Sequence, residues 1–155
     1  MLNRLQKLTR KMWQNLPLIV RVGVIRRTQE KFTASATAII VNDKGEVLLL
    51  DHVFRPTSGW ALPGGFLQAS EQVQAAVQRE IREEVGLELI NVTLYFAHTN
   101  GRHIEIYLTA SPVGEPRVNS REIIGFKWFR LDEVPSDMSY TQQRLIREVL
   151  QTGFD

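Results

Sequence analysis

Three glutamates, Glu80, Glu83 and Glu84, stand three and four residues apart within the segment 79–87. If this segment is helical, their carboxylates lie on one face within a single turn, because residues three and four apart share a helix face. Their mutual repulsion destabilises such a helix unless another group compensates. The chain must therefore fold in a way that gives these charges a partner.

An apolar stripe accompanies the three carboxylates along the same predicted helix. It consists of Val73, Val77, Ile81 and Val85. These residues recur at helical spacing and predict a buried face. The glutamates are therefore expected at the edge of the core rather than in open solvent. Crowded carboxylates at a partly buried position favour a bound cation.

The side chains available as ligands in this segment offer only oxygen donors. The chain has no cysteine, and its three histidines lie outside the segment. Glutamate oxygens suit a hard ion such as Mg²⁺, with Mn²⁺ as a substitute, and such an ion takes further ligands from the phosphates of a substrate. A polarised diphosphate beside a carboxylate that activates water indicates hydrolysis of a phosphoanhydride bond.

The complete spacing pattern resembles the Nudix box, GX5EX7REUXEEXGU, in which U is an aliphatic residue. The matching positions are Gly65, Glu71, Arg79, Glu80, Ile81, Glu83, Glu84, Gly86 and Leu87. The approach at residues 59–65 and the later segment 122–135 are also similar to this family, so the resemblance extends over residues 32–150. It implies an α/β fold, the Nudix-type α/β/α sandwich with a mixed β-sheet.

The resemblance also implies a metal site built from the box. Glu80 and Glu84 would be the principal ligands, and Glu83 would be a further ligand or the general base. The backbone carbonyl of Gly64 would supply another ligand. The expected ion is Mg²⁺, which Mn²⁺ could replace.

Further site candidates lie around these ligands. Glu71 and Arg79 are expected to form a buried ion pair that fixes the loop to the helix, in the way that outer residues orient metal ligands. Family members draw the general base from the box or from a later loop, and outside the box we select Glu122, with Glu115 as the alternative. Arg55, in the loop before the box, is a candidate for binding phosphate, although an exposed loop arginine without that role explains it equally well.

The length of 155 residues predicts one globular domain, at residues 32–155, preceded by an extension at residues 1–31. The expected strands cover residues 32–41, 46–53, 88–98, 103–110 and 123–130. The expected helices cover residues 71–85, between Ser70 as N-cap and Gly86, and residues 140–151. The turn at 42–45 predicts a hairpin of the first two strands, and Asn100-Gly101 predicts another hairpin.

The extension differs in charge from the rest of the chain. Residues 1–31 contain eight Lys or Arg and one Glu, a net charge of +7, whereas the remainder carries −5. Its first sixteen residues predict an N-terminal amphipathic helix. The apolar stripe is Leu2, Leu5, Leu8, Met12, Trp13 and Leu16. We expect this stripe to pack on the domain or on a second subunit, which would make a homodimer. A membrane-surface contact and disorder are the alternatives.

Composition narrows the remaining functions. The absence of cysteine fits a reducing cytoplasm, and no run reaches the length of about 18 apolar residues that spans a membrane. The expected partner is a small nucleotide: first a nucleoside diphosphate linked to another moiety, of ADP-ribose or nucleotide-sugar type, and second a (deoxy)nucleoside triphosphate. The proline that marks many ADP-ribose pyrophosphatases is absent, since Arg102 and His103 stand there.

Two functions of other classes remain open. A non-catalytic nucleotide sensor could lose box glutamates at little cost, yet all four are present, which favours an enzyme. Removal of diphosphate from RNA would use the basic extension to bind phosphates. No stable nucleic-acid partner is expected, because the regular apolar stripe favours packing.

Overall fold

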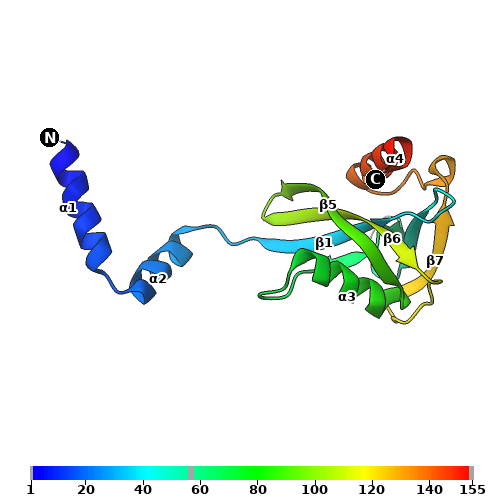
Figure 1. The fold of residues 1–155 in the computed structure, drawn as a ribbon, viewed down its shortest axis with the longest axis horizontal. Coiled ribbons are helices and arrows are strands. Elements are labelled where there is room, and N and C mark those ends of the chain that lie inside the picture. Colours follow the sequence, from blue (N-terminus) through cyan, green and yellow to red (C-terminus); the bar gives the residue numbers. More distant parts are fainter. Residues whose placement is uncertain (1, 56–57, 154–155) are drawn as a thin grey trace. The chain divides into compact units, whose positions relative to one another are not determined.

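The computed structural model describes residues 2–55 and 58–153 and separates the chain into two compact units, Met1–Phe32 and Thr33–Asp155 (Figure 1). The first unit holds two helices, α1 (Leu2–Asn15) and α2 (Leu18–Thr28). α1 confirms the expected N-terminal helix, whereas α2 was not predicted. Pro17 separates them because it cannot continue a helix, and its carbonyl accepts the N–H groups of Val20 and Arg21 at the start of α2.

The second unit combines strands in two sheets with two long helices. Its elements, within the described residues, are β1 (Thr33–Ile40), β2 (Val47–His52), β3 (Trp60–Ala61), β4 (Gly64–Phe66), α3 (Val73–Val85), β5 (Glu88–Asn100), β6 (His103–Val113), β7 (Ile123–Phe129), the 3₁₀ helix η1 (Leu131–Glu133) and α4 (Tyr140–Thr152). The four-stranded sheet has the order β4-β1-β6-β5, with β1 parallel to β6 and the other pairs antiparallel. The three-stranded sheet, β3-β2-β7, is antiparallel.

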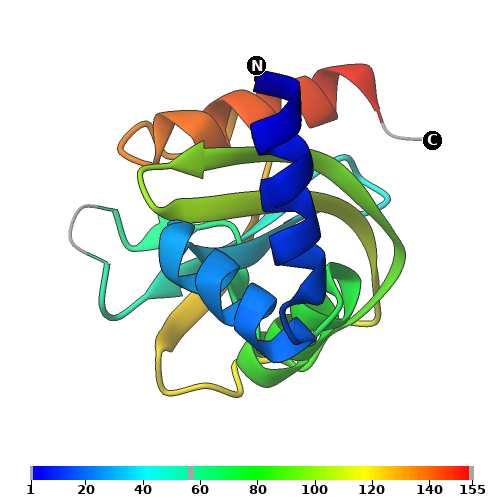
Figure 2. The ribbon, with the colours of Figure 1, turned by 90° about the vertical axis from the view of Figure 1, so that its left-hand side faces the viewer.

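Both faces of the central strands are buried. Along β2, Leu48 and Leu50 join one apolar cluster, while Val47 and Leu49 join another. The first cluster includes the buried face of α3, and the second includes that of α4. Figure 1 and Figure 2 accordingly show α3 and α4 on opposite sides of the strands. This arrangement confirms the expected α/β/α sandwich with a mixed sheet.

The hairpin expected from the first two strands is wrong. β1 and β2 belong to different sheets, and the antiparallel bridge beside the turn joins Val47 to Val41, which lies just after the end of β1. Each strand is apolar at successive positions, as in Ile39 and Ile40, and such strands are buried on both faces. β1 therefore pairs with β4 and β6, while β2 pairs with β3 and β7.

The remaining expectations hold with local differences. The hairpin of β5 and β6, the strand β7 and the helix α4 are confirmed. The segment 54–65, which includes the loop before the box, contains β3 and the start of β4, and its residues 56–57 lie outside the described part. α3 begins at Val73 rather than residue 71, and Gln72 takes the N-cap position expected of Ser70. The side chain of Glu71 instead accepts the backbone N–H of Gln68 at 2.9 Å, which keeps this residue in the loop.

Gly64 marks the closest approach of the loop to the sheet. It pairs with Thr37 of β1 and has a φ of +147°, a conformation that L side chains rarely adopt. A Cβ at this position would overlap the carbonyl oxygen of Ala36. The glycine is therefore required by backbone conformation and by space.

Replacing Gly64 with alanine tests this requirement. Gly64→Ala should lower the free energy of unfolding by about 2 kcal/mol or more, because the added methyl group meets backbone that cannot yield locally. Urea denaturation measures the change. Gly125→Ala is the matched control, since a Cβ there meets open space, and it should stay within about 0.5 kcal/mol. Equal effects of the two substitutions would contradict the assignment.

Candidate active site

α3 places Glu80 and Glu84 at the edge of the core, as expected, whereas Glu83 is exposed to solvent, contrary to the expectation. Its buried residues are Ala76, Val77, Ile81 and Val85. On the adjoining face, the side chain of Glu80 is 19% exposed and that of Glu83 is 61% exposed. The helix ends at Gly86, whose left-handed conformation lets its N–H reach the carbonyl of Arg82 at 3.0 Å.

Glu84 occupies the most constrained position of the three. The backbone N–H of Gly64 donates a hydrogen bond to its carboxylate, while its Oε2 atom is buried and has no hydrogen-bond partner among residues 2–55 and 58–153. Burial raises the pKa of Glu84 to about 8, and the negative charge of Glu80 adds to this increase. Loss of a proton at Glu84 therefore leaves a desolvated negative charge that lacks full compensation.

Glu80 lies against the glycine loop. A Cβ on Gly65 would overlap the Glu80 carboxylate, so only glycine lets the loop backbone pass at this distance. Nη1 of Arg79 donates to Oε1 of Glu80 at 2.7 Å and lies 3.5 Å from Oε2 of Glu83. The structure thus brings the loop and the three carboxylates of α3 together.

The expected ion pair of Glu71 and Arg79 is present, but it is partly rather than fully buried, with side chains 14% and 23% exposed. Nε and Nη2 of Arg79 donate to the two carboxylate oxygens of Glu71 at 2.8 and 3.0 Å. Nη2 also donates to the carbonyl of Phe66 at 3.3 Å. The guanidinium, together with the N–H of Gln68, lowers the pKa of Glu71 to about 2. This pair ties the loop at 66–72 to α3.

A backbone hydrogen bond holds Glu122 near the site. Its carbonyl accepts the N–H of Val53 at 2.9 Å, which holds it beside the end of β2. The carbonyls of Glu84 and Val85 accept the N–H groups of Asn119 and Arg117, so the chain before Glu122 also caps α3. The carboxylate of Glu122 lies close enough to Glu84 to contribute to the rise in its pKa.

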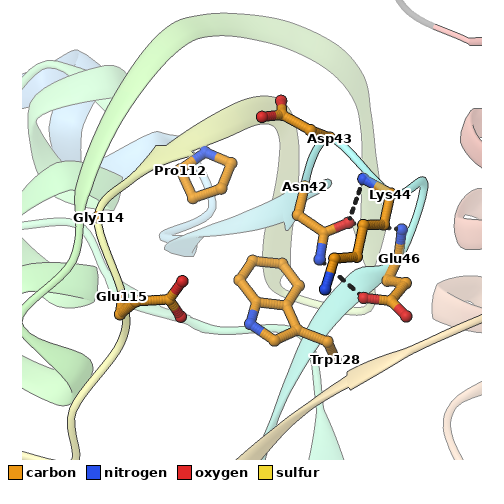
Figure 3. A pocket seen from close by; sticks show the side chains of 8 residues that line it. All are labelled: Asn42, Asp43, Lys44, Glu46, Pro112, Gly114, Glu115 and Trp128. Carbon is orange, nitrogen blue, oxygen red and sulfur yellow. Dashed lines mark hydrogen bonds between the residues drawn. The ribbon is translucent and has the colours of Figure 1, made fainter.

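Glu115 lies elsewhere. It lines a separate cleft of about 360 Å³ around the indole of Trp128 and the turn that begins at Asn42 (Figure 3). Asp43, Lys44, Glu46, Pro112 and Gly114 complete this lining. The geometry thus places Glu122, and not Glu115, beside the carboxylates of α3.

Arg55 lines a second cleft and also interacts electrostatically with Glu84. Its guanidinium is within electrostatic range of Glu84 and Glu105. The cleft has a volume of about 250 Å³. It is lined by Ser35, Thr37, Arg55, His103, Glu105, Tyr107, Ser139 and Gln142. Its polar walls can recognise a hydrogen-bonding ligand next to the carboxylate site.

Hydrogen bonds fix the walls of this cleft. The Tyr107 hydroxyl donates to Glu105 at 2.7 Å, and the buried amide oxygen of Gln142 accepts the backbone N–H of Leu62 at 3.1 Å. The imidazole of His103 lies 2.7 and 2.8 Å from the hydroxyls of Thr33 and Ser35.

The sequence reasoning missed this cleft. A signal existed, because polar residues alternate along both β1 and β6, but their alignment depends on the parallel register of the two strands, in which Ser35 pairs with Glu105 and Thr37 with Tyr107. That register cannot be read from either segment alone.

The carboxylate site fits a cation. Among residues 2–55 and 58–153, no group of three or more His, Asp or Glu side chains is arranged so that it could hold a metal ion. However, the unpartnered Oε2 of Glu84 and the adjacent carboxylate of Glu80 form an incompletely compensated, partly buried site. Oxygen donors of this kind suit a hard divalent ion such as Mg²⁺.

Comparison with known proteins identifies the family. A family model described as NUDIX domain matches residues 31–149, so this chain belongs to the NUDIX family. It is 32% identical to a MutT NUDIX hydrolase from Burkholderia pseudomallei, whose crystal structure aligns with a TM-score of 0.67 over 77% of this chain and 99% of that one. The chain therefore has the domain of Nudix hydrolases.

Curated relatives carry different activities in their names. The 8-oxo-dGDP phosphatase NUDT18 of Danio rerio is 35% identical over 79 residues, which are 50% of this chain and 24% of that protein. A MutT-like protein of Streptomyces ambofaciens is 28% identical over 69% of this chain and 70% of its own length. The human mitochondrial NAD(P)H pyrophosphatase NUDT13 is 30% identical over 72% of this chain and 34% of its own length. The chain thus spans only about a quarter of the NUDT18 protein and about a third of the NUDT13 protein.

The burial of Glu84 predicts a pH-dependent stability. Its pKa is about 8 in the folded chain against 4.5 ordinarily, so ionisation destabilises the fold progressively as the pH rises from 4.5 to 8. In metal-free buffer at pH 8, Glu84→Gln should therefore be more stable than the natural chain by roughly 1–3 kcal/mol. Urea denaturation with a chelator tests this.

The difference should shrink towards pH 4, where Glu84 is protonated in both the folded and unfolded states. Mg²⁺ should raise the melting temperature of the natural chain and have little effect on the variant. Equal stabilities at pH 4 and pH 8 would contradict a buried, uncompensated carboxylate.

Proposed function

We propose that this protein is a metal-dependent pyrophosphohydrolase. Its substrate is a nucleoside diphosphate linked to another moiety, of the ADP-ribose or nucleotide-sugar type. The observation that carries the proposal is the unpartnered, buried carboxylate oxygen of Glu84 beside Glu80. Arg55 connects this site electrostatically with the polar cleft, which provides space for the remainder of a nucleotide.

Glu80 and Glu84 are proposed to hold Mg²⁺ as principal ligands, with Glu83 and the backbone carbonyl of Gly64 as further ligands. Mn²⁺ would be a substitute. The bound ion would neutralise the charge of the diphosphate and polarise its phosphorus. Arg79 is proposed to position a metal ligand, because its guanidinium orients Glu80 while it also pairs with Glu71.

Glu122 is proposed as the general base. It removes a proton from water as the water oxygen bonds to phosphorus and the bridging anhydride oxygen departs with its electron pair. Its position near Glu84 and outside the Arg79 pairings supports this role. Glu83 is the alternative base, since its carboxylate is exposed and reachable. Arg55 is proposed to bind a phosphate of the substrate.

Hydrolysis of a (deoxy)nucleoside di- or triphosphate is the second candidate. The similarity to the 8-oxo-dGDP phosphatase of Danio rerio favours it, because the name of that protein gives a nucleoside diphosphate as its substrate. The first candidate is favoured by the similarity to an NAD(P)H pyrophosphatase, whose named substrate contains a diphosphate bridge. A nucleotide sensor without turnover is the alternative of another class.

Product release from a panel of substrates distinguishes these functions. The panel contains nucleotide sugars, dinucleotides such as NADH, 8-oxo-dGDP and deoxynucleoside triphosphates, each with Mg²⁺, with Mn²⁺ and with a chelator. Metal-dependent release of a monophosphate from diphosphate-linked substrates is expected. Release from 8-oxo-dGDP or from triphosphates, without turnover of the linked diphosphates, would favour the second candidate, and binding without turnover would favour the sensor.

Substitution of the acidic residues tests their separate roles. Glu84→Gln should lower the metal-dependent rate at least about 100-fold, since a ligand is lost. Glu122→Gln should lower kcat by about 100-fold or more while metal affinity stays unchanged. Glu88→Gln is the control. It removes an exposed carboxylate at the start of β5 that pairs with Arg82 of α3. An unchanged rate in Glu122→Gln would return the base to Glu83.

The role of Arg55 can be measured through substrate affinity. Arg55→Ala should raise KM about tenfold, because a charge-assisted hydrogen bond to phosphate is lost. Arg147→Ala removes an exposed arginine from α4 and should leave KM unchanged. A common effect of the two variants would show that only the net charge of the domain matters.

A further inference from the structure

The N-terminal unit exposes its apolar side chains. In α1, Leu5, Leu8 and Met12 are 70%, 59% and 65% exposed, and in α2, Leu18 and Ile19 are 68% and 81% exposed. Among the residues described in these two helices, none is buried. The unit by itself therefore cannot cover its own apolar surface, and such a surface indicates an interaction site.

α1 separates apolar from basic residues. At about 3.6 residues per turn, its apolar side chains fall on one side of the helix. They are Leu5, Leu8, Met12 and Trp13, and Leu16 follows just after the end of the helix. Arg4, Lys7, Arg10 and Lys11 fall on the opposite side. A cationic helix of this kind can lie in the plane of a lipid surface, with its apolar face among the acyl chains and its Lys and Arg side chains at the headgroups.

α2 has a different pattern that points to the same environment. Its residues Leu18, Ile19, Val20, Val22, Val24 and Ile25 surround the helix. Arg21, Arg26 and Arg27 stand between them, so α2 has no single apolar face and exposes apolar and basic side chains together. Its arginines, Arg21, Arg26 and Arg27, are long enough to extend to a polar boundary. Within the described residues, no helix has the length and hydropathy to cross a bilayer, so the fit is to the interface.

Charge favours an anionic surface. The first 31 residues carry a net charge of +7. Juxtamembrane basic residues are attracted to anionic headgroups, and each adds about fivefold to binding. Trp13, which lies on the apolar face of α1, is of the residue type enriched at the boundary between lipid and water.

We propose that residues 2–28 bind the surface of an anionic lipid bilayer and thereby attach the Nudix domain to a membrane. α1 lies in the interface with its apolar face towards the acyl chains, and α2 inserts its apolar side chains beside it. The basic residues of both helices contact the headgroups. This attachment is independent of the hydrolysis proposed above.

Co-sedimentation of the full chain with lipid vesicles tests the proposal. Vesicles of phosphatidylcholine are compared with vesicles that contain about one third phosphatidylglycerol, at low and at high salt. Strong binding is expected only to the anionic vesicles at low salt. Lys7→Gln with Lys11→Gln should weaken this binding roughly 30-fold, and the difference should narrow as salt screens the charges.

A second pair of variants separates lipid insertion from charge attraction. Leu8→Gln with Met12→Gln keeps the net charge and should weaken binding at least about tenfold, because apolar burial is lost. Asn3→Gln with Gln14→Asn changes the polar side of α1 and is the matched control, with unchanged binding. Thermal unfolding of each variant establishes that the Nudix domain is folded.

Three outcomes would overturn the proposal. The first is equal binding of the natural chain and Leu8→Gln/Met12→Gln to anionic vesicles. The second is a dimer, detected by analytical ultracentrifugation, that these two substitutions dissociate while vesicles capture neither protein, which would assign the apolar face to a second copy. The third is salt-sensitive binding to RNA in place of vesicles, which would assign the basic residues to nucleic acid.

Discussion

The backbone of Gly64 and Gly65 runs between β1 and α3 where no side chain fits. A Cβ on Gly64 would overlap the carbonyl of Ala36, and a Cβ on Gly65 would overlap the carboxylate of Glu80. This double close approach joins the sheet to the carboxylate-bearing face of the helix. It also lets the N–H of Gly64 reach Glu84. The site therefore depends on a packing constraint that two glycines make attainable.

Around this contact, the charges are compensated unequally. Arg79 pairs with Glu71 and Glu80 and lies near Glu83, so one guanidinium offsets much of the repulsion within the site. Among the residues that the structure describes, a backbone N–H and the more distant charge of Arg55 offset the charge of Glu84 only in part, and its pKa rises accordingly. The fold thus tolerates one unfavourable carboxylate at the position where a cation would be held. The burial of Glu84 lowers the stability of the metal-free protein, and the same burial favours the binding of a cation.

Local patterns were sufficient for much of this arrangement. The periodicity around Ile81 predicted α3 and its buried face, and Asn100-Gly101 predicted the turn between β5 and β6. The pairing of Glu71 with Arg79 followed from the resemblance and is present in the structure. The prediction of a hairpin from the first two strands was wrong, because an apolar strand can pair with any strand whose faces are equally buried. Short-range turn signals do not identify that partner. α2 was missed because β-branched residues after Pro17 give no amphipathic period.

The sequence by itself determined which groups the protein brings to its chemistry: three glutamates and an arginine at helical spacing, a fourth glutamate and two glycines before them, and a basic extension of distinct composition. Only the tertiary structure decided which charge is left without a partner, and which polar residues form the neighbouring cleft. Helical spacing fixes neighbours along one element, but desolvation of Glu84 and the register of β1 with β6 arise from segments far apart in the chain. Those quantities depend on how separate elements pack, and no local pattern encodes them.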